Sequence, residues 1–397
     1  MKILHTSDWH LGRRLEGASL AEPHEHFLNW LIEDFLPVHK PDLMVISGDI
    51  FDRPIPPTDA MELYEKSIAK IIKSGTQVLI SAGNHDNRVR LGFHSIFMDE
   101  MGLHLRTRLR DVDRPLVLEN DDFILLSYGI PYLEPDVDAG TDAHQWDVES
   151  TPDGVMGEAL SRIKRDIADR KSKSVKPIRT LVASHAWVAG GESSDSERNV
   201  RIGTLGQASA SLFADIDYVA MGHLHGPQRV SYEDAHIFYS GSPIPFSFSE
   251  KDHVKRILLV EYTKDGVAAE NITSHEISQI RKMQQIRDSV EALMSEKYLA
   301  TDDWIKVIVT DQEVPLNFYD TLKREKFSHL VQLVPEKSID GIVDRSGNGV
   351  LLQELSHEEV TKRFVKRILR AEELDTQMIE TIENCCSEVA LTEMELN

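Results

Sequence analysis

Residues 1–10 have the sequence MKILHTSDWH, in which the apolar pair Ile3-Leu4 leads to Asp8 and His10. Continuous apolar runs are typical of buried parallel strands, and ligands in open α/β sheets bind beyond the carboxyl ends of those strands. Four later stretches repeat the arrangement: Leu43–Ile46 before Gly48-Asp49 and Asp52, Val78–Ile80 before Gly83-Asn84-His85-Asp86, Leu181–Ala183 before His185, and Tyr218–Met221 before Gly222-His223-Leu224-His225. We therefore expect five strand ends to converge on one site.

Helical periodicity separates these runs. Apolar residues recur at helical spacing over Leu28–Leu36, where Pro37 and Pro41 should end the helix, and over Met61–Ile72, which Gly75 should end. A helix near Val155–Ile167 is predicted before a strand at Ile178–Ser184. Alternating strands and helices predict an α/β fold with parallel strands.

The chain of 397 residues is too long for one ordinary core. We expect a catalytic core over residues 1–274 and a small α/β capping domain over 275–336, with a helix at Met283–Leu293 and strands at Ile305–Val309 and Leu330–Val334. A glycine-bearing linker, 337–350, should follow. The last segment, 351–397, has two amphipathic helices that either fold back on the core or dock on a partner.

The composition indicates a globular protein: 41% of residues are apolar and 28% are charged. No run has the roughly 18 apolar residues of a membrane span, and a strand beginning at Met1 leaves no room for a signal peptide, so a cytoplasmic protein is expected. The adjacent Cys385 and Cys386 are interpreted as reduced packing thiols.

The formal net charge of -22 argues against a protein that coats nucleic acid by bulk electrostatics. Arginines nevertheless follow the first three motifs, where they either contact phosphates locally or are solvated surface residues. These candidate DNA-contacting residues are Arg13, Arg14, Arg53, Arg88 and Arg90. Two divalent ions would add positive charge at the same place, so global acidity and local phosphate attraction can coexist.

The five motifs, taken in order, resemble those of the calcineurin-like metallophosphoesterases. The resemblance implies an α/β sandwich that holds two divalent ions, which neutralise a phosphoester and activate water. Asp49 would bridge the ions, with Asp8, His10 and His225 completing one site and Asn84, His185 and His223 the other. Ligands without thiolate suit Mn²⁺, with Mg²⁺, Fe or Zn²⁺ as alternatives.

The resemblance also gives roles to residues that are not ligands. It implies that His85 stabilises the transition state or protonates the leaving oxygen. Asp86 would orient the His85 imidazole, or else stabilise a turn through its own backbone contacts. Asp52 would either support the ligands or cap a helix, and Trp9 would either form the site wall or stack on substrate. His5, His24 and His26 are expected to be structural or exposed.

A closer resemblance is to the nuclease subunits of SbcCD-type complexes. It rests on MKILHTSDWHLG at the start, GDIFD at 48–52, YSGSPIPFSF at 239–248 and LSHEEV at 355–360. The resemblance implies a homodimeric, Mn²⁺-dependent DNA nuclease with roles in DNA repair, replication and recombination. It further implies a heterotetramer with SbcC, an ABC-type ATPase whose coiled coils the C-terminal helices would grip.

Family members degrade double-stranded DNA from its ends as 3′ to 5′ exonucleases and cut single strands and hairpins as endonucleases. ATP use must come from the partner, because this sequence has no GxxxxGK[ST] phosphate loop. Two other classes remain open. A small-molecule phosphodiesterase of the same superfamily would share every ligand but would not need the capping domain or the C-terminal helices. A non-catalytic scaffold would be expected to have lost ligands.

Overall fold

The structure is a computed structural model that describes residues 1–142, 144–197, 206–311, 313–336, 361–362, 378–379 and 381. Its contacts divide the chain into two units. The larger unit contains Met1–Ile286, Tyr298–Val307 and Tyr319–Gln332, and the smaller contains Arg287–Lys297, Ile308–Phe318 and the described residues of Leu333–Asn397. Most of the predicted C-terminal segment, 351–397, and the linker, 337–350, lie outside the described residues.

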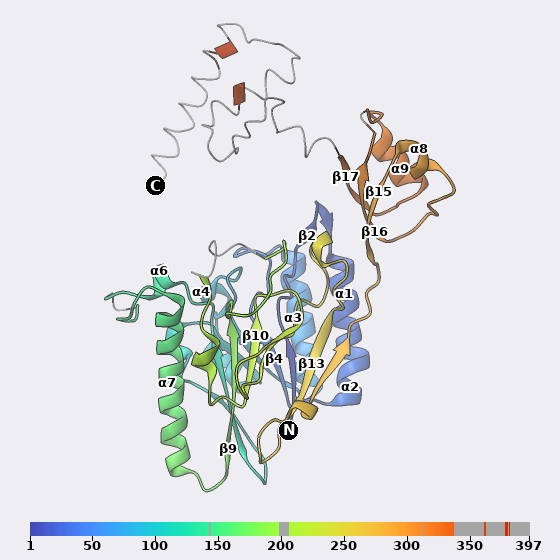
Figure 1. The fold of residues 1–397 in the computed structure, drawn as a ribbon. Coiled ribbons are helices and arrows are strands. Elements are labelled where there is room, and N and C mark those ends of the chain that lie inside the picture. Colours follow the sequence, from blue (N-terminus) through green and yellow to red (C-terminus); the bar gives the residue numbers. More distant parts are fainter. Residues whose placement is uncertain are drawn as a thin grey trace. The chain divides into compact units, whose positions relative to one another are not determined.

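Two six-stranded sheets form the larger unit (Figure 1). The first has the order β14 (Ile272–Glu276), β13 (Arg256–Glu261), β1 (Lys2–Thr6), β4 (Leu43–Ser47), β5 (Gln77–Ser81) and β6 (Leu103–Arg106). The second has the order β11 (Gln228–Val230), β12 (Ile237–Tyr239), β10 (Tyr218–Gly222), β9 (Ile178–His185), β8 (Ile124–Ile130) and β7 (Leu116–Glu119). The motif-bearing strands of both sheets pair in parallel, as their continuous apolar runs predict, whereas β13 is antiparallel to β1.

Helices cover the outer face of each sheet, so the unit is a four-layer α/β sandwich (Figure 1). The first sheet is covered by α1 (Ala21–Asn29), a π-helical turn (Trp30–Phe35), α2 (Leu36–His39) and α3 (Thr58–Lys73), and the second by α7 (Pro152–Lys173). Between the sheets, a third apolar cluster includes Val45, Leu79 and Leu181. The predicted α/β sandwich is therefore the fold of this unit.

Shorter elements connect these layers. The hairpin of β2 (Arg14–Leu15) and β3 (Ala18–Ser19) follows the first motif, and α4 (Arg88–Leu91) and α5 (Ser95–Glu100) follow the third. Other short helices in the described residues include α6 (Pro135–Asp138) and the 3₁₀ turns Leu109–Asp111, Ala210–Phe213, Phe248–Glu250 and Ala269–Asn271. The strand ends that carry the motifs stay level with one another, since Ser47 pairs with Ser81 and Gly222 pairs with His185.

A third sheet contains β15 (Met283–Asp288), β16 (Trp304–Val309) and β17 (Leu330–Pro335), with α8 (Val290–Met294) and α9 (Phe318–Glu325). The predicted helix at Met283–Leu293 is wrong over its first half. Met283, Ile286, Val290 and Leu293 have helical spacing, but residues 283–288 pair as a strand and the helix begins only after Ser289, whose side chain accepts from the N–H of Ala292. Sheet pairing overrides the local periodicity here.

Pro37 does not end the first helix, contrary to the prediction. It lies inside α2, and the helical path continues to His39 before Lys40 adopts a left-handed conformation at φ 48°. The preceding π-helical turn, in which the N–H of Leu36 donates to the carbonyl of Leu31, widens the helix just before the proline. A wider turn reduces the clash between the proline ring and the previous turn, which explains why the helix tolerates it.

Candidate metal centre

The five motif-bearing strand ends meet at one place, as the sequence predicts. Asp8 and His10 follow β1, Asp49 follows β4, Asn84 follows β5, His185 ends β9, and His223 and His225 follow β10. Their donor atoms form close groups, among them Asp8 with His10 and His225, and Asp8 with Asp49 and His185. Six of the seven side chains are buried and Asn84 is half-buried. Both sheets therefore contribute to the site.

Asp49 lies at the centre of the group. Its Oδ2 atom is 3.4 Å from Nε2 of His10 on one side and 3.4 Å from Nε2 of His185 on the other. Its Oδ1 atom accepts a hydrogen bond of 2.8 Å from the backbone N–H of His85. The carboxylate thus stands between imidazoles from different sheets, the position that a bridging ligand requires.

The other donors gather on the two sides of Asp49. Nε2 of His10 and Nε2 of His225 are 3.2 Å apart. On the opposite side, Oδ1 of Asn84 is 3.0 Å from Nε2 of His185 and 3.2 Å from Nδ1 of His223. Asp8 is fixed by the backbone of the last motif, since the N–H of His223 donates to Oδ1 of Asp8 over 3.0 Å. His10 and His225 thus lie together on one side of Asp49, and Asn84, His185 and His223 lie together on the other.

Three motif glycines permit this close approach. A Cβ atom on Gly48 would lie 2.2 Å from Nδ1 of His185, one on Gly83 would lie 2.1 Å from Oδ1 of Asp49, and one on Gly222 would lie 1.8 Å from the carbonyl oxygen of Ser47. Real Cβ atoms do not come so close to other heavy atoms. The glycines that precede the ligands in the Gly-Asp, Gly-Asn-His-Asp and Gly-His motifs therefore make room for the site itself.

The backbone is strained at several of the predicted ligands. Asp8, His10 and Asp49 have φ values of 53°, 44° and 50°, and His223 has a φ of 106°. Residues other than glycine rarely adopt these backbone conformations, which each cost about 1–3 kcal/mol. Such strain persists only where the surrounding packing imposes it, and it aims these side chains at a common point.

Burial and mutual charge determine the protonation of these groups. Burial holds the pKa of His10 well below its usual value and lowers the pKa of His223 to about 3. Burial raises the pKa of Asp8 to about 6. Burial acts against charge at His185, but the neighbouring Asp49 carboxylate outweighs it and raises the pKa of His185 to about 9. The lowered pKa values keep His10 and His223 neutral, as metal ligands must be, whereas His185 would have to release its proton when an ion binds.

The donor set fits a pair of divalent ions. Carboxylate oxygens of Asp8 and Asp49 lie within 4.8 Å of each other in a buried place, where their like charges repel unless a cation lies between them. Carboxylate, amide and imidazole ligands without thiolate suit Mn²⁺ or Mg²⁺ better than soft metals. In the described part of the chain, the groups close enough to hold an ion include these residues and a neighbouring group of His10, Asp52 and His85.

The side chain of Asp86 has a different partner from the expected one. Its carboxylate accepts hydrogen bonds from the backbone N–H groups of Ile50, Phe51 and Gly83, at 3.2, 3.1 and 2.9 Å. Nδ1 of His85 lies instead 2.7 Å from the carbonyl oxygen of Asp52. These contacts favour the alternative interpretation, in which Asp86 stabilises the loop. Burial, reinforced by the charge of Asp49, raises the pKa of Asp86 to about 7.

The five arginines are not equivalent. Arg88 makes a two-pronged ion pair with the buried Asp138, with both N–O distances 2.7 Å, so its charge is used inside the fold. Arg13 lies 3.5 Å from Asp52 and stacks on the ring of Phe246, with 4.8 Å between its guanidinium carbon and the ring centre. Arg14, Arg53 and Arg90 are exposed.

Sequence reasoning missed the aromatic wall of the site. Phe246 packs edge-on against His10 and His225, with ring centres 5.1 and 5.3 Å away. Tyr132 stacks on His223 with ring centres 6.3 Å apart. Phe246 belongs to the YSGSPIPFSF stretch, whose apolar residues after Gly-Ser-Pro were the available signal. Trp9, by contrast, is fully buried against Phe27, so it does not face substrate.

The sequence is similar to that of known phosphoesterases. The family model for calcineurin-like phosphoesterase matches residues 1–227. A curated relative, an SbcCD nuclease subunit of Staphylococcus saprophyticus, is 32% identical over 301 residues, which cover 75% of this chain and 74% of that protein.

Two solved structures also align with this chain. TT1561 of Thermus thermophilus aligns over 70% of this chain and 99% of that chain, with a TM-score of 0.40 and 10% identity. Haemophilus influenzae NAD nucleotidase (NadN) aligns over 70% of this chain and 56% of that chain, with a TM-score of 0.38 and 15% identity. The sequence matches, taken with the five converging motifs, show that the chain belongs to the calcineurin-like phosphoesterases and, among them, to the family of the SbcCD nuclease subunit.

Proposed function

We propose that this chain is the nuclease subunit of an SbcCD-type complex and hydrolyses DNA phosphodiester bonds. The observation that carries the proposal is the position of the Asp49 carboxylate, 3.4 Å from an imidazole nitrogen on each side, at the meeting point of both sheets. Asp8, His10 and His225 would hold one divalent ion, and Asn84, His185 and His223 the other. The ions would be Mn²⁺, with Mg²⁺ as the alternative.

A bound pair of divalent ions would neutralise the phosphodiester and supply an activated water. The protein's own part is to hold donors in fixed positions and to exclude bulk water. Burial of the imidazoles and carboxylates strengthens their interaction with charge, and the apolar Phe246 closes one side of the site. Backbone strain at Asp8, His10 and Asp49 keeps these donors directed inward before any ligand binds.

His85 is proposed as the residue that stabilises the transition state or protonates the leaving oxygen. Its Nδ1 atom is 2.7 Å from the carbonyl oxygen of Asp52, so Nδ1–H donates there, and Nε2 is the nitrogen that we propose takes part in the reaction. Its ring meets that of His10 edge-on, with 4.6 Å between ring centres. A contact with a backbone carbonyl fixes the orientation of the imidazole, as a carboxylate partner would.

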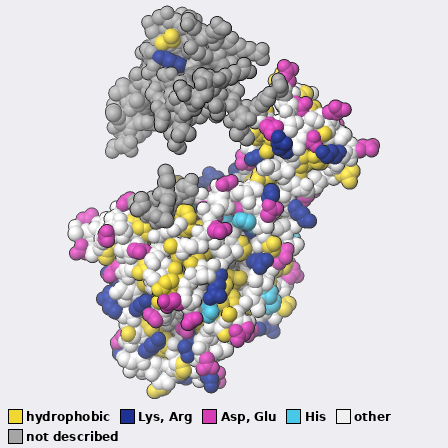
Figure 2. Space-filling view, in the orientation of Figure 1, with side chains coloured by type: hydrophobic (Ala, Val, Ile, Leu, Met, Phe, Trp, Pro, Cys, Tyr) yellow, Lys and Arg dark blue, Asp and Glu magenta, His cyan; other side chains and the backbone are white. Residues whose placement is uncertain are grey.

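Local charge would hold DNA. Figure 2 shows acidic and basic side chains interspersed over the visible surface, without one basic patch that could coat a duplex. Arg14, Arg53 and Arg90 are exposed near the motifs and can reach phosphates, whereas Arg88 is committed to Asp138. A nuclease with a charge of -22 would therefore depend on its metal ions and on a partner for much of its DNA affinity.

The partner would be an SbcC-type ABC ATPase with coiled coils, in a heterotetramer built on a homodimer of this chain. With the partner, the chain would act as an ATP-dependent 3′ to 5′ exonuclease on double strands, and it would cut single strands and hairpins as an endonuclease, in DNA repair, replication and recombination.

Residues 1–274 would form the nuclease core, 275–336 the capping domain, 337–350 a linker and 351–397 the ATPase-binding segment. A cytoplasmic location is proposed. None of the helices in the described residues has the length and apolar character of a membrane span.

An exposed apolar surface supports the homodimer. We call it the α4–α5 surface. It consists of large, exposed apolar side chains: Val89 (64% exposed), Phe93 (66%), Ile96 (65%), Phe97 (69%) and Met101 (69%). Isolated exposed apolar residues are normal, but a cluster of large ones within 13 positions marks an interaction site. A second copy of this chain would cover it.

The test replaces the bridging carboxylate. Asp49→Asn keeps the size of the side chain and its acceptor for the N–H of His85, but it removes the charge that two cations would share. We expect the purified variant to retain fewer than one Mn²⁺ per chain after dialysis and to lose cleavage of end-labelled duplex and hairpin DNA. Asp153→Asn, at the start of α7, is the matched control.

The same assay separates the nuclease from the alternative small-molecule phosphodiesterase. The unmodified protein should cleave hairpin and single-stranded DNA in Mn²⁺ far faster than a small phosphodiester. Efficient hydrolysis of the small substrate without DNA cleavage would favour the alternative. Full two-ion occupancy in Asp49→Asn would refute the bridging role.

A further inference from the structure

The imidazole of His225 is fixed from behind by side chains that the proposed reaction does not use. Its Nε2 atom faces His10, and its Nδ1 atom lies 2.6 Å from Oγ of Ser196. The Ser196 hydroxyl also donates to Oε1 of Glu250. A hydroxyl has a single proton and the carboxylate can only accept, so Ser196 must accept a hydrogen bond from Nδ1–H of His225. In the neutral imidazole this hydrogen bond places the proton on Nδ1 and leaves Nε2 unprotonated, which is the tautomer that binds a metal through Nε2.

A buried ion pair supports this contact. Glu250 is 1% exposed and Lys255 is 2% exposed, and Nζ of Lys255 donates to Oε2 of Glu250. The same ammonium group donates to Oγ of Ser242 over 2.8 Å and to the carbonyl oxygen of His225 over 3.1 Å. The pair thus holds His225 at two points, directly at its backbone and through Ser196 at its ring.

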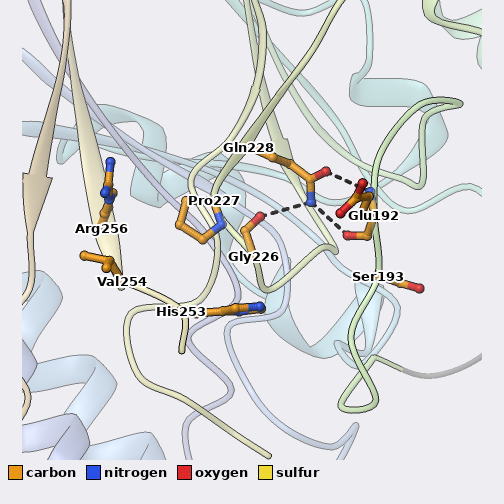
Figure 3. A pocket seen from close by; sticks show the side chains of 8 residues that line it. All are labelled: Glu192, Ser193, Gly226, Pro227, Gln228, His253, Val254 and Arg256. Atoms are coloured by element: carbon orange, nitrogen blue, oxygen red, sulfur yellow. Dashed lines mark hydrogen bonds between the residues drawn. The ribbon is translucent and has the colours of Figure 1, made fainter. Parts of the chain in front are cut away.

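The loop that carries Ser196 is anchored on both sides. Nη2 of Arg13 donates to the carbonyl oxygen of Ser196 over 2.7 Å, and the carboxylate of Glu197 accepts from the N–H of His225 over 2.7 Å. At the start of the loop, the side chain of Gln228 makes two hydrogen bonds of 2.8 Å with the backbone of Glu192, beside a cavity of about 370 Å³ (Figure 3). The hydroxyl of Ser196 is therefore held in place by contacts from several elements.

Other imidazoles of the site are oriented differently. Nδ1 of His185 faces the carbonyl oxygen of Ser47 at 2.8 Å, and Nδ1 of His85 faces that of Asp52. Those backbone acceptors come with the fold and need no particular side chain. At His225 the acceptor is a serine on a loop, backed by a buried ion pair. Burying two charges is costly and rarely adds stability, which suggests that this pair serves the site.

We propose that Ser196, Glu250 and Lys255 form a positioning relay that fixes His225 in the tautomer and orientation required for metal binding. The loop 192–197 is then part of the metal centre, although it contains no ligand. This inference rests on the proposed function because it takes His225 to be a ligand. Residues that hydrogen-bond a metal-binding histidine typically change metal affinity by about 10–100-fold. Loss of the relay should therefore lower the affinity for the ion that His225 binds more than the affinity for the other ion.

The primary test is Ser196→Ala in the full-length, metal-free protein, titrated with Mn²⁺ by calorimetry. One of the two Mn²⁺ affinities should fall by about 10–100-fold while the other stays constant. The electron paramagnetic resonance signal of coupled Mn²⁺ ions should appear only at higher Mn²⁺ concentration. Ser196→Thr keeps the hydroxyl and should restore the affinity. Ser127→Ala removes a buried hydroxyl without a hydrogen-bond partner in the described chain and is the matched control.

A double variant tests the ion pair without leaving one buried charge alone. Glu250→Gln with Lys255→Met should weaken the same Mn²⁺ site as Ser196→Ala, and combining all three changes should add little. Unchanged Mn²⁺ binding by Ser196→Ala would overturn the inference, and so would an equal loss at both sites with a lower melting temperature. If the unmodified protein binds fewer than two ions, the proposed function itself fails, which distinguishes the two results.

Discussion

His85 is held by a backbone carbonyl while its neighbour Asn84 points at the imidazoles of His185 and His223. Two adjacent residues of one motif therefore have separate tasks, and a substitution at His85 should affect chemistry without removing metal. We expect His85→Gln to bind two Mn²⁺ ions and DNA as the parent does, while turnover falls by about 10²-fold or more, the scale of losing a general acid. Single-turnover cleavage with metal analysis measures both. Loss of metal together with activity would reassign His85 as a ligand.

Two buried histidines outside the site make stability depend on pH. Burial lowers the pKa of His5 to about 3 and the pKa of His24 to about 4, against 6.5 for an unfolded chain. Above pH 6.5 neither state is charged. As the pH falls below that value, these histidines bind protons in the unfolded chain but not in the folded chain. Each histidine therefore lowers the free energy of unfolding by about 1.4 kcal/mol per pH unit.

Urea unfolding of the metal-free protein between pH 7 and pH 5 checks this expectation. His5→Gln or His24→Gln should each make the unfolding free energy depend less steeply on pH. The slope should fall by about 1.4 kcal/mol per pH unit, which corresponds to one proton. The exposed His144→Gln is the control and should keep the parent's slope. An unchanged slope in both buried variants would mean that other groups take up the protons.

At the residue scale, the sequence predicted that the seven proposed metal donors lie at the ends of strands, and the topology of the sheets brings these strand ends together. It could not identify the partners of those donors. Ser196 and Glu250 reach His225 from positions 29 residues before and 25 residues after it, without a periodic pattern to mark them. Nor could it decide between the interpretations of Asp86, whose three backbone partners come from two separate loops.

At the element scale, the apolar runs predicted the inner strands well because burial on both faces imposes continuous hydrophobicity. Prediction failed where an element's environment differs from its local pattern. Residues 283–288 have helical spacing but pair with a neighbouring strand, and Pro37 continues a helix because a π-helical turn precedes it. Both differences depend on contacts that a single segment does not contain.

The carboxyl ends of β10 and β4 lie close together. A Cβ atom on Gly222 would lie 1.8 Å from the carbonyl oxygen of Ser47. The same oxygen faces Nδ1 of His185 and orients that imidazole. Gly222→Ala should therefore push the two strand ends apart, lower the free energy of unfolding by about 2 kcal/mol or more, and weaken Mn²⁺ binding. Urea unfolding and metal titration measure the two effects. Gly157→Ala is the control, because a Cβ there meets, among the described residues, only Leu212 at 3.9 Å and alanine favours the helix. A stable Gly222→Ala protein with normal metal affinity would contradict the argument.

At the scale of the whole molecule, assembly depends on surfaces that the metal site does not use. The sequence assigns the ATPase contact to Leu352–Val389, which lies almost entirely outside the described residues. Truncation at Asp344 should leave Mn²⁺-dependent cleavage of single-stranded DNA intact but abolish binding to the ATPase and ATP-stimulated digestion of duplex ends. Undiminished ATPase binding by the truncated protein, or an unfolded core, would show that the segment serves the fold instead.

The α4–α5 surface provides the test of the homodimer. Phe93 and Phe97 are 66% and 69% exposed, so they contribute little to the core of a single chain, but their burial between two chains would stabilise a dimer. Full burial of an aromatic side chain contributes about 1.5–3 kcal/mol. In a symmetric dimer both chains bury their copy of each residue, so each substitution removes two such contributions. Phe93→Ser with Phe97→Ser should therefore raise the dissociation constant by at least about 10³-fold.

Sedimentation equilibrium of the parent and the double variant measures this change directly. The variant should be monomeric where the parent is dimeric but should remain folded and keep two Mn²⁺ sites, since neither phenylalanine contacts the metal donors in the described contacts. Val175→Ser, which removes another exposed apolar side chain after α7, should leave the dimer intact and controls for general surface effects. A double variant that remains dimeric would place the interface elsewhere. A parent that is itself monomeric would refute the homodimer, and the exposed apolar side chains of this surface would then have to bind a different chain.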